Sequence, residues 1–256
     1  QCILNLLKTI TIWKQNTKTK IYMKKGKKNI EGVGYNKGDK YEDKITNILI
    51  DKEILPNDYK RAGASHKSDI VVPYKNKKIN VEIKNKSKGA DYGQKELKWS
   101  KERKFFWTDK DPNDQIVKLY ERLNIIEKYL DQDYVPRRYS VDIKKLTKAD
   151  KQYDLDRCKQ KAVTIPLEAL ILYYEIKKCY YIQIEKSGFY HLRKDIFNLG
   201  TPKFDGKVGI RLRTKTRSSK KIHMYGLLGK IALMEKPTPS KFDIEELEGR
   251  EFPFKD

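Results

Sequence analysis

The sequence predicts an α/β fold with a mixed central sheet flanked by helices and a β-rich C-terminal part. Two patterns predict this class. An amphipathic helical segment precedes two short alternating strands, and most apolar runs of the C-terminal half are short and strand-like. The 256 residues suffice for one large domain or two small ones, and the 17 Tyr and 8 Phe argue against disorder.

The first predicted element is a helix over residues 39–54. Asp39 is a plausible N-cap, and an apolar stripe follows at helical spacing: Tyr41, Ile45, Ile48 and Leu49. Glu42 lies three residues before Ile45, so it borders the buried face of this helix rather than the solvent face. Pro56, within residues 55–58, ends the element.

Two short strands are predicted next. The first covers residues 69–72 and is closed by Pro73, residues 75–77 form the turn, and the second strand covers residues 78–84. In the second strand an apolar face of Ile79, Val81 and Ile83 alternates with Asn80, Glu82 and Lys84. Glu82 and Lys84 therefore point to the same side, with their Cα atoms about 7 Å apart.

The remaining elements are predicted from the same periodicities. Residues 85–93 are expected to form a flexible loop, and residues 131–165 to be polar and irregular. Helices are predicted at 94–104, from Asp111-Pro112 to about residue 131, and at 167–175. Strands are predicted at 180–184, 189–192 and 208–212. Residues 222–233 fit strands or a helix, and residues 242–256 form an acidic end.

The charge balance favours an anionic polymer as partner. Lys and Arg outnumber Asp and Glu by 57 to 35, which gives a net charge of +22 and a pI of about 9.6. The alternative is a lysine-rich surface that only keeps the protein solvated, because lysine is scattered through the whole chain.

The cysteines and apolar runs exclude other classes. Cys2, Cys158 and Cys179 are isolated and lack C-x-x-C spacing, so neither a zinc site nor a disulfide framework is predicted. The sequence has no apolar run of the ~20 residues that a membrane span needs, and its start lacks the features of a signal peptide. We therefore expect no membrane association and an intracellular, cytoplasmic and nucleoid-associated location.

The candidate catalytic residues come from the first three elements. Asp69 begins the first strand, Glu82 and Lys84 share a face of the second, and Glu42 lies at the inward edge of the helix. A lone E-x-K is weak evidence, because any amphipathic strand of a lysine-rich chain can contain one. The added carboxylates favour a metal-dependent nuclease, in which carboxylate oxygens hold Mg²⁺ and a lysine meets the scissile phosphate.

These residues resemble the PD-(D/E)xK nuclease superfamily, whose order is matched by Glu42, Asp69 and Glu82-Ile83-Lys84. Within it, the surrounding segments are most similar to type II restriction endonucleases: residues 38–42, 68–72, 81–84 and 92–94. The resemblance covers residues 38–99, about a quarter of the chain. The proline of the family name is absent, since Ser68 precedes Asp69.

The resemblance implies a role for each candidate. Asp69, Glu82 and the Ile83 carbonyl would ligate Mg²⁺, for which Mn²⁺ can substitute, and Glu42 would bind the outer shell or a second ion. Lys84 would orient or deprotonate the attacking water and stabilise charge on the phosphorane. It also implies double-strand cleavage of DNA at a specific short sequence, a homodimer matching two-fold DNA, and a separate cognate methyltransferase.

Residues 207–221 are the main candidate for reading DNA, because they hold seven basic residues and no acidic one. Val208, Ile210 and Leu212 alternate with polar positions, as in a strand with one basic face. The predicted DNA contacts are Lys86, Lys88, Gln94, Arg211, Arg213, Lys215, Arg217, Lys220 and Lys221. The alternatives are an edge strand kept soluble by charge and, for Gln94, an ordinary residue at a helix start.

We divide the chain accordingly into a peripheral extension (1–22), a catalytic core (23–135) and a β-rich recognition region (136–256). The last two are expected to pack as one domain. The first boundary rests on Met23, which is the first Met of a sequence that starts with Gln. Two other functions stay open: a structure-specific nuclease resembling a Holliday junction resolvase, and a basic nucleic-acid-binding protein without catalysis. In the last case, Asp69, Glu82 and Lys84 would be replaceable.

Overall fold

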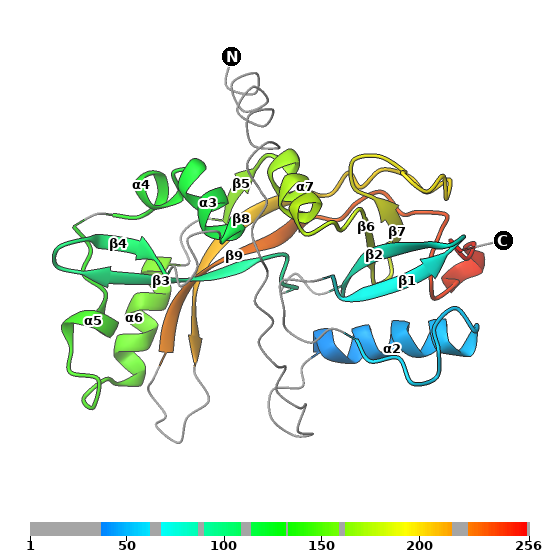
Figure 1. Ribbon diagram of the computed structural model, residues 1–256. Coiled ribbons are helices and arrows are strands. Elements are labelled where there is room, and N and C mark those ends of the chain that lie inside the picture. Colours follow the sequence, from blue (N-terminus) through cyan, green and yellow to red (C-terminus); the bar gives the residue numbers. More distant parts are fainter. Residues whose placement is uncertain are drawn as a thin grey trace, which may run out of the picture. The chain divides into compact units, whose positions relative to one another are not determined.

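The computed structural model describes residues 37–61, 68–86, 90–108, 114–131, 133–158, 162–216 and 225–254 (Figure 1). The chain divides into two units, Gln1–Val33 and Gly34–Asp256, and all described residues belong to the second. The predicted extension at residues 1–22 lies outside them. The described part is a mixed α/β structure with two sheets. Within it, no helix has both the length and the apolar content needed to cross a membrane.

The first sheet is mixed and has the strand order β1-β2-β6-β7. Its strands are β1 (Ile70–Tyr74), β2 (Lys77–Lys84), β6 (Tyr181–Ile184) and β7 (Gly188–His191). β2 is antiparallel to β1 but parallel to β6, and β6 is antiparallel to β7. A parallel pair needs a crossover connection, and the last element of that connection is the helix α7 (Leu167–Ile176).

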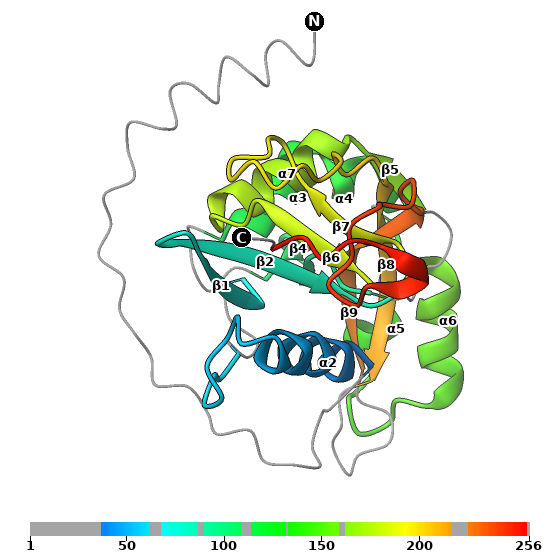
Figure 2. The same cartoon turned by 90° about the vertical axis from the view of Figure 1, so that its right-hand side faces the viewer.

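One face of the first sheet is covered by α2 (Lys37–Asp51), which runs along β1 and β2 in both views (Figures 1 and 2). Tyr41, Ile45 and Leu49 of α2 are buried in a cluster with the apolar face of β2. The C-terminal segment completes this cluster with Phe242, Ile244, Phe252 and Phe254.

The acidic C-terminal segment also folds back onto α2 through polar contacts. Glu245 is almost fully buried and accepts hydrogen bonds from the Tyr41 hydroxyl, at 2.8 Å, and from the Lys44 ammonium. The carboxylates of this segment therefore neutralise part of the basic surface of the chain's own first described helix.

The second sheet is antiparallel and has the order β4-β3-β9-β8-β5. Its strands are β3 (Gln94–Ser100), β4 (Lys104–Trp107), β5 (Ala162–Ile165), β8 (Lys207–Thr216) and β9 (Tyr225–Glu235). The helices between β4 and β5 are α3 (Gln115–Arg122), α4 (Ile125–Tyr129), α5 (Arg137–Ser140) and α6 (Lys148–Cys158). Tyr120 of α3 packs edge-on against Trp107 of β4, with ring centroids 4.7 Å apart.

Most predicted elements are confirmed near their expected positions. The helix at 39–54 is α2, the helix at 167–175 is α7, and the predicted strands correspond to β1, β2, β6, β7 and β8. Of residues 222–233, which fitted either class, the described ones, 225–233, belong to strand β9 (Tyr225–Glu235). β1 does not stop at Pro73, which pairs with Lys78. Proline is tolerated there because β1 is an edge strand of its sheet.

Two predicted helices are wrong in type or extent. Residues 94–104 do not form a helix: Gln94–Ser100 is strand β3, which pairs with β4 and β9 on its two sides. The helix predicted from Asp111-Pro112 starts at Gln115, where the Asp114 carboxylate accepts hydrogen bonds from two backbone N–H groups. Asp111 and Pro112 lie outside the described residues. Asn124, with φ 49°, then separates α3 from α4.

The prediction that residues 131–165 are irregular is also wrong, because α5, α6 and β5 lie there. α6 lacks an apolar stripe and is held instead by its fully buried Asp154. That carboxylate accepts hydrogen bonds from the Tyr134 and Tyr225 hydroxyls and from the N–H groups of Arg137 and Arg138. A sequence pattern does not reveal a helix whose anchor depends on such distant partners.

Candidate active site

The register of β1 and β2 brings Asp69, Glu82 and Lys84 together. Ile70 pairs with Val81, so Asp69, one residue earlier, comes beside Glu82, one residue later. Asp69 Oδ2 accepts a hydrogen bond from the Ile83 N–H at 2.8 Å and lies 3.3 Å from Lys84 Nζ. Glu82 Oε1 lies 2.5 Å from the same ammonium. The two carboxylates thus converge on a single cationic group at the end of β2.

Glu82 has a second cationic partner, Lys177, which the sequence analysis missed. Lys177 Nζ lies 3.0 Å from Glu82 Oε2, so each carboxylate oxygen of Glu82 has its own lysine. Lys177 is the C-cap of α7, where a cation is favoured by the helix dipole. The only signal in the sequence was a lysine at the end of a predicted helix, and that signal is too common to single it out.

Glu42 lies close enough to Asp69 and Lys84 for their charges to affect its pKa, but its carboxylate forms an ion pair with a different residue. Its carboxylate pairs with Arg61, which also pairs with Asp43. Burial raises the pKa of Glu42 to about 7; the negative charge of Asp69 adds to the rise, while Lys84 and Arg61 oppose it. Arg61 was also missed, since it lies beyond the end of the predicted helix.

The buried charges set the protonation of the site. Burial raises the pKa of Asp69 above its usual value, although the Lys84 ammonium works against this rise. Burial alone would raise the pKa of Glu82, but Lys84 and Lys177 together bring it below its usual value. Burial alone would lower the pKa of Lys84, whereas Asp69 and Glu82 hold it well above the usual value. Lys84 is therefore a charged donor at neutral pH.

Asp69 and Glu82 are the two candidate ligands whose carboxylates the structure brings together, so the fit to a Mg²⁺ ion depends on this pair. Over the ranges that the structure describes, no group of three or more His, Cys, Asp or Glu side chains is placed to hold a metal. Glu42 is not part of such a group, and its carboxylate pairs with Arg61 instead. Mg²⁺ is usually held by one or two carboxylates together with water and substrate phosphates, so two converging carboxylates are compatible with it. Ile83 lies between Glu82 and Lys84 with its side chain buried on the α2 face.

The predicted DNA contacts lie in two places. Gln94 and Arg211 are both paired with Lys230, so the three form one row across β3, β9 and β8. Arg213 and Lys215 continue along β8 on that face, because Val208, Ile210 and Leu212 are buried on the other. Lys86 follows Asn85 after the end of β2. The remaining predicted contacts lie outside the described residues: Lys88, Arg217, Lys220 and Lys221.

Lys230, at the centre of this row, is a further residue that the sequence analysis missed. Its side chain is buried, which lowers its pKa to about 8; Arg213, Arg211 and Lys215 add to the lowering, while Asp91 opposes it. The row therefore combines basic side chains from two strands. A strand prediction for residues 225–235 would have placed Lys230 on the face opposite Leu227 and Ile231, but residues 222–233 fitted two classes.

Comparisons with known proteins give little support for any identity. No family model and no curated protein matches the chain. A solved structure of the HhaI endonuclease in complex with DNA is similar at 13% sequence identity and a TM-score of 0.39. The match covers 77% of this chain and 92% of that one. A TM-score this low does not establish a common fold, so the function has to be inferred from the residues of this chain.

Proposed function

We propose that the protein is a metal-dependent endodeoxyribonuclease that hydrolyses phosphodiester bonds of double-stranded DNA. The observation that carries the proposal is the meeting of Asp69, Glu82 and Lys84 at the end of β2. Two carboxylates and one ammonium suit phosphodiester hydrolysis, because the reaction needs both a metal site and a positive donor for the phosphate. A chain with a net charge of +22 is suited to a polyanionic substrate.

Each residue has a role in this proposal. Asp69, Glu82 and the Ile83 carbonyl would hold Mg²⁺, or Mn²⁺ in its place, and Glu42 would contribute to its outer shell or to a second ion. When bound, the ion would act as a Lewis acid and lower the pKa of its water. Lys84 would orient the attacking water and donate hydrogen bonds to the phosphate as negative charge grows on its oxygens. Its raised pKa favours the donor role over that of a base.

The finer proposal is a type II restriction endonuclease with a PD-(D/E)xK core. Arg211 and Arg213 on one face of β8 support DNA reading, since arginine can contact guanine bidentately in the major groove. Cutting both strands at a symmetric sequence would require a homodimer. A nuclease of this kind needs its host DNA protected, so we expect a separate methyltransferase as its biological partner.

The test is cleavage of unmethylated phage DNA with Mg²⁺ or EDTA, using the natural sequence, Lys84→Ala and the control Lys78→Ala. Lys78 lies at the other end of β2 and is exposed. Discrete fragments that need Mg²⁺ and vanish only in Lys84→Ala support the full proposal.

The other outcomes separate the alternatives. A smear means nuclease activity without sequence specificity. DNA that stays intact calls for branched substrates, and cleavage of those alone would identify a structure-specific nuclease. A protein that binds DNA equally well without Asp69, Glu82 and Lys84, and never cuts it, would be a binding module.

A further inference from the structure

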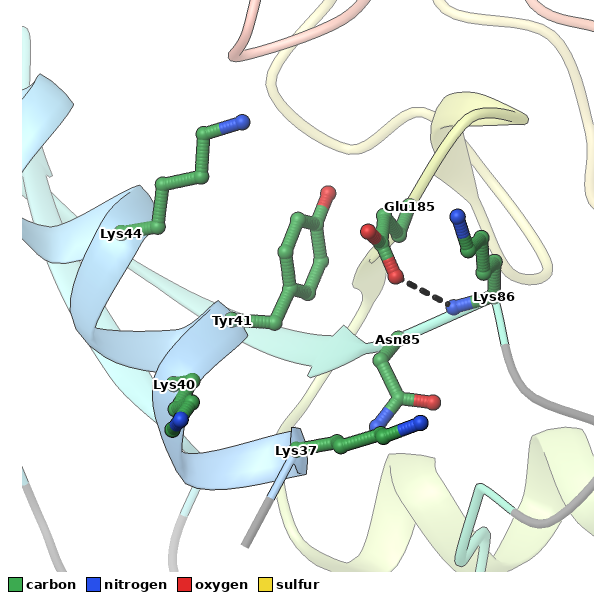
Figure 3. A pocket seen from close by; sticks show the side chains of 7 residues that line it. All are labelled: Lys37, Lys40, Tyr41, Lys44, Asn85, Lys86 and Glu185. Atoms are coloured by element: carbon green, nitrogen blue, oxygen red, sulfur yellow. Dashed lines mark hydrogen bonds between the residues drawn. The ribbon is translucent and has the colours of Figure 1, made fainter.

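A pocket of about 510 Å³ lies between α2 and the chain that leaves β2 (Figure 3). Four lysines line it, namely Lys37, Lys40, Lys44 and Lys86. Glu185 is the one carboxylate among the described lining residues. Asp69, Glu82 and Lys84 do not line it, so the pocket is distinct from the candidate catalytic group although it starts one residue beyond Lys84.

The lysines of α2 concentrate positive charge on one side of the helix. Lys37, Lys40 and Lys44 are spaced by three and four residues, and residues at this spacing are neighbours on a helix surface. Like charges in such positions repel each other. Lys44 is neutralised by Glu245, whereas the described residues offer no ion pair to Lys37 or Lys40. An anion in the pocket would relieve this repulsion.

The other wall of the pocket is held in place by the protein itself. The Glu185 carboxylate accepts a hydrogen bond from the backbone N–H of Lys86 at 2.9 Å, drawn as the dashed line in Figure 3. This bond fixes the backbone just after β2. The described part of the chain offers no ion pair to the Lys86 ammonium. Lys86 thus lines the pocket two residues beyond Lys84, after the end of β2.

The pocket lies next to the catalytic group along the chain, because Asn85, the residue after Lys84, lines it. Two residues of chain span at most about 7 Å, so the Cα atom of Lys86 lies within that distance of the Cα atom of Lys84. A DNA strand advances about 3.4 Å per phosphate along the helix axis. A strand with its scissile phosphate at Lys84 would therefore bring a phosphate one or two nucleotides away to this pocket.

We propose that this pocket binds a backbone phosphate of the DNA strand being cut, through Lys37, Lys40 and Lys86. The inference rests on the proposed nuclease function, and it adds a substrate-positioning site on α2. Lysine gives phosphate affinity and carries little sequence information, so the pocket aligns the strand and does not read bases.

The test is the salt dependence of binding to a fluorescently labelled DNA duplex, measured by anisotropy in EDTA so that no cleavage occurs. In the double variant Lys37→Ala/Lys40→Ala, the slope of log K against log salt should become shallower by about one unit for each phosphate that the variant no longer binds. In Mg²⁺, KM for cleavage should rise while kcat stays unchanged. The charge-preserving variant Lys37→Arg/Lys40→Arg should keep the original slope.

A matched control is Lys78→Ala/Lys128→Ala, which removes two exposed lysines outside the pocket and should leave the slope unchanged. An unchanged slope in Lys37→Ala/Lys40→Ala overturns the pocket assignment even if the protein cuts DNA. A reduced slope in a protein that binds but never cuts DNA supports the phosphate site and refutes the nuclease. A protein that does not bind the duplex at all overturns both.

Discussion

At the scale of single residues, Glu82 depends on two lysines. Its buried carboxylate has one partner on its own strand, Lys84, and one on a distant helix, Lys177. Removing a partner from a buried charge lowers the stability of the fold more than removing one from an exposed charge, because water cannot replace the missing hydrogen bond. Lys177 thus contributes both to the stability of the fold and to the position of the Glu82 oxygens.

We predict that Lys177→Met lowers the free energy of unfolding by about 1–3 kcal/mol, since it leaves one Glu82 oxygen without its partner. The measurement is urea unfolding at neutral pH in EDTA. Lys177→Arg keeps a cation at this place and should retain most of the stability. Equal stability of the Met variant and the natural protein would show that the ion pair contributes nothing.

Lys230 offers a pH test at the same scale. Its pKa of about 8 in the folded protein lies below the ordinary value of 10.5, so the unfolded chain binds more protons between these pH values. Stability should therefore rise as the pH increases from 8 to 10.5. We predict that Lys230→Met is more stable than the natural protein at pH 7. The difference in the free energy of unfolding, measured by urea unfolding, should shrink as the pH rises from 8 to 10.5. A constant difference would contradict the lowered pKa.

At the scale of elements, the attachment of helix α6 to the rest of the fold depends on the carboxylate of Asp154. Asp154→Ala would leave the Tyr134 and Tyr225 hydroxyls and two backbone N–H groups without their acceptor. We predict a loss of about 3 kcal/mol in the free energy of unfolding. The control is Asp156→Ala on the same helix, where an exposed carboxylate accepts a hydrogen bond from Gln152 and the loss should be small. A similar loss in both variants would argue against the anchoring role of Asp154.

The elements show which parts of the fold a sequence can reveal. α2, β1 and β2 were predictable because burial on one face leaves a periodic apolar pattern, and the same pattern placed Glu82 beside Lys84. β3 was mistaken for a helix, because its place is set by pairing with β4 and with β9, more than 120 residues later. Lys177 and Arg61 escaped detection for the same reason: tertiary contacts alone bring them to the site.

At the scale of the whole molecule, the charge of +22 should dominate DNA affinity. A protein that makes six to ten phosphate contacts loses roughly 10³-fold or more in affinity between about 50 and 200 mM salt. We predict a loss of this size for an unrelated duplex, measured by anisotropy in EDTA. A specific duplex should retain more of its affinity, because base contacts release fewer counterions. Affinity that hardly changes with salt would exclude a mainly electrostatic interface.

The aromatic C-terminal segment has a consequence for the protein during synthesis. Phe242, Ile244, Phe252 and Phe254 leave the ribosome after all the other described elements, yet they belong to the cluster that buries α2. A nascent chain halted before residue 240 would lack these side chains, and the helix that carries Glu42 would have an incomplete core. We therefore expect α2 and Glu42 to reach their final positions only after translation has passed this segment, and the proposed nuclease activity to arise no earlier.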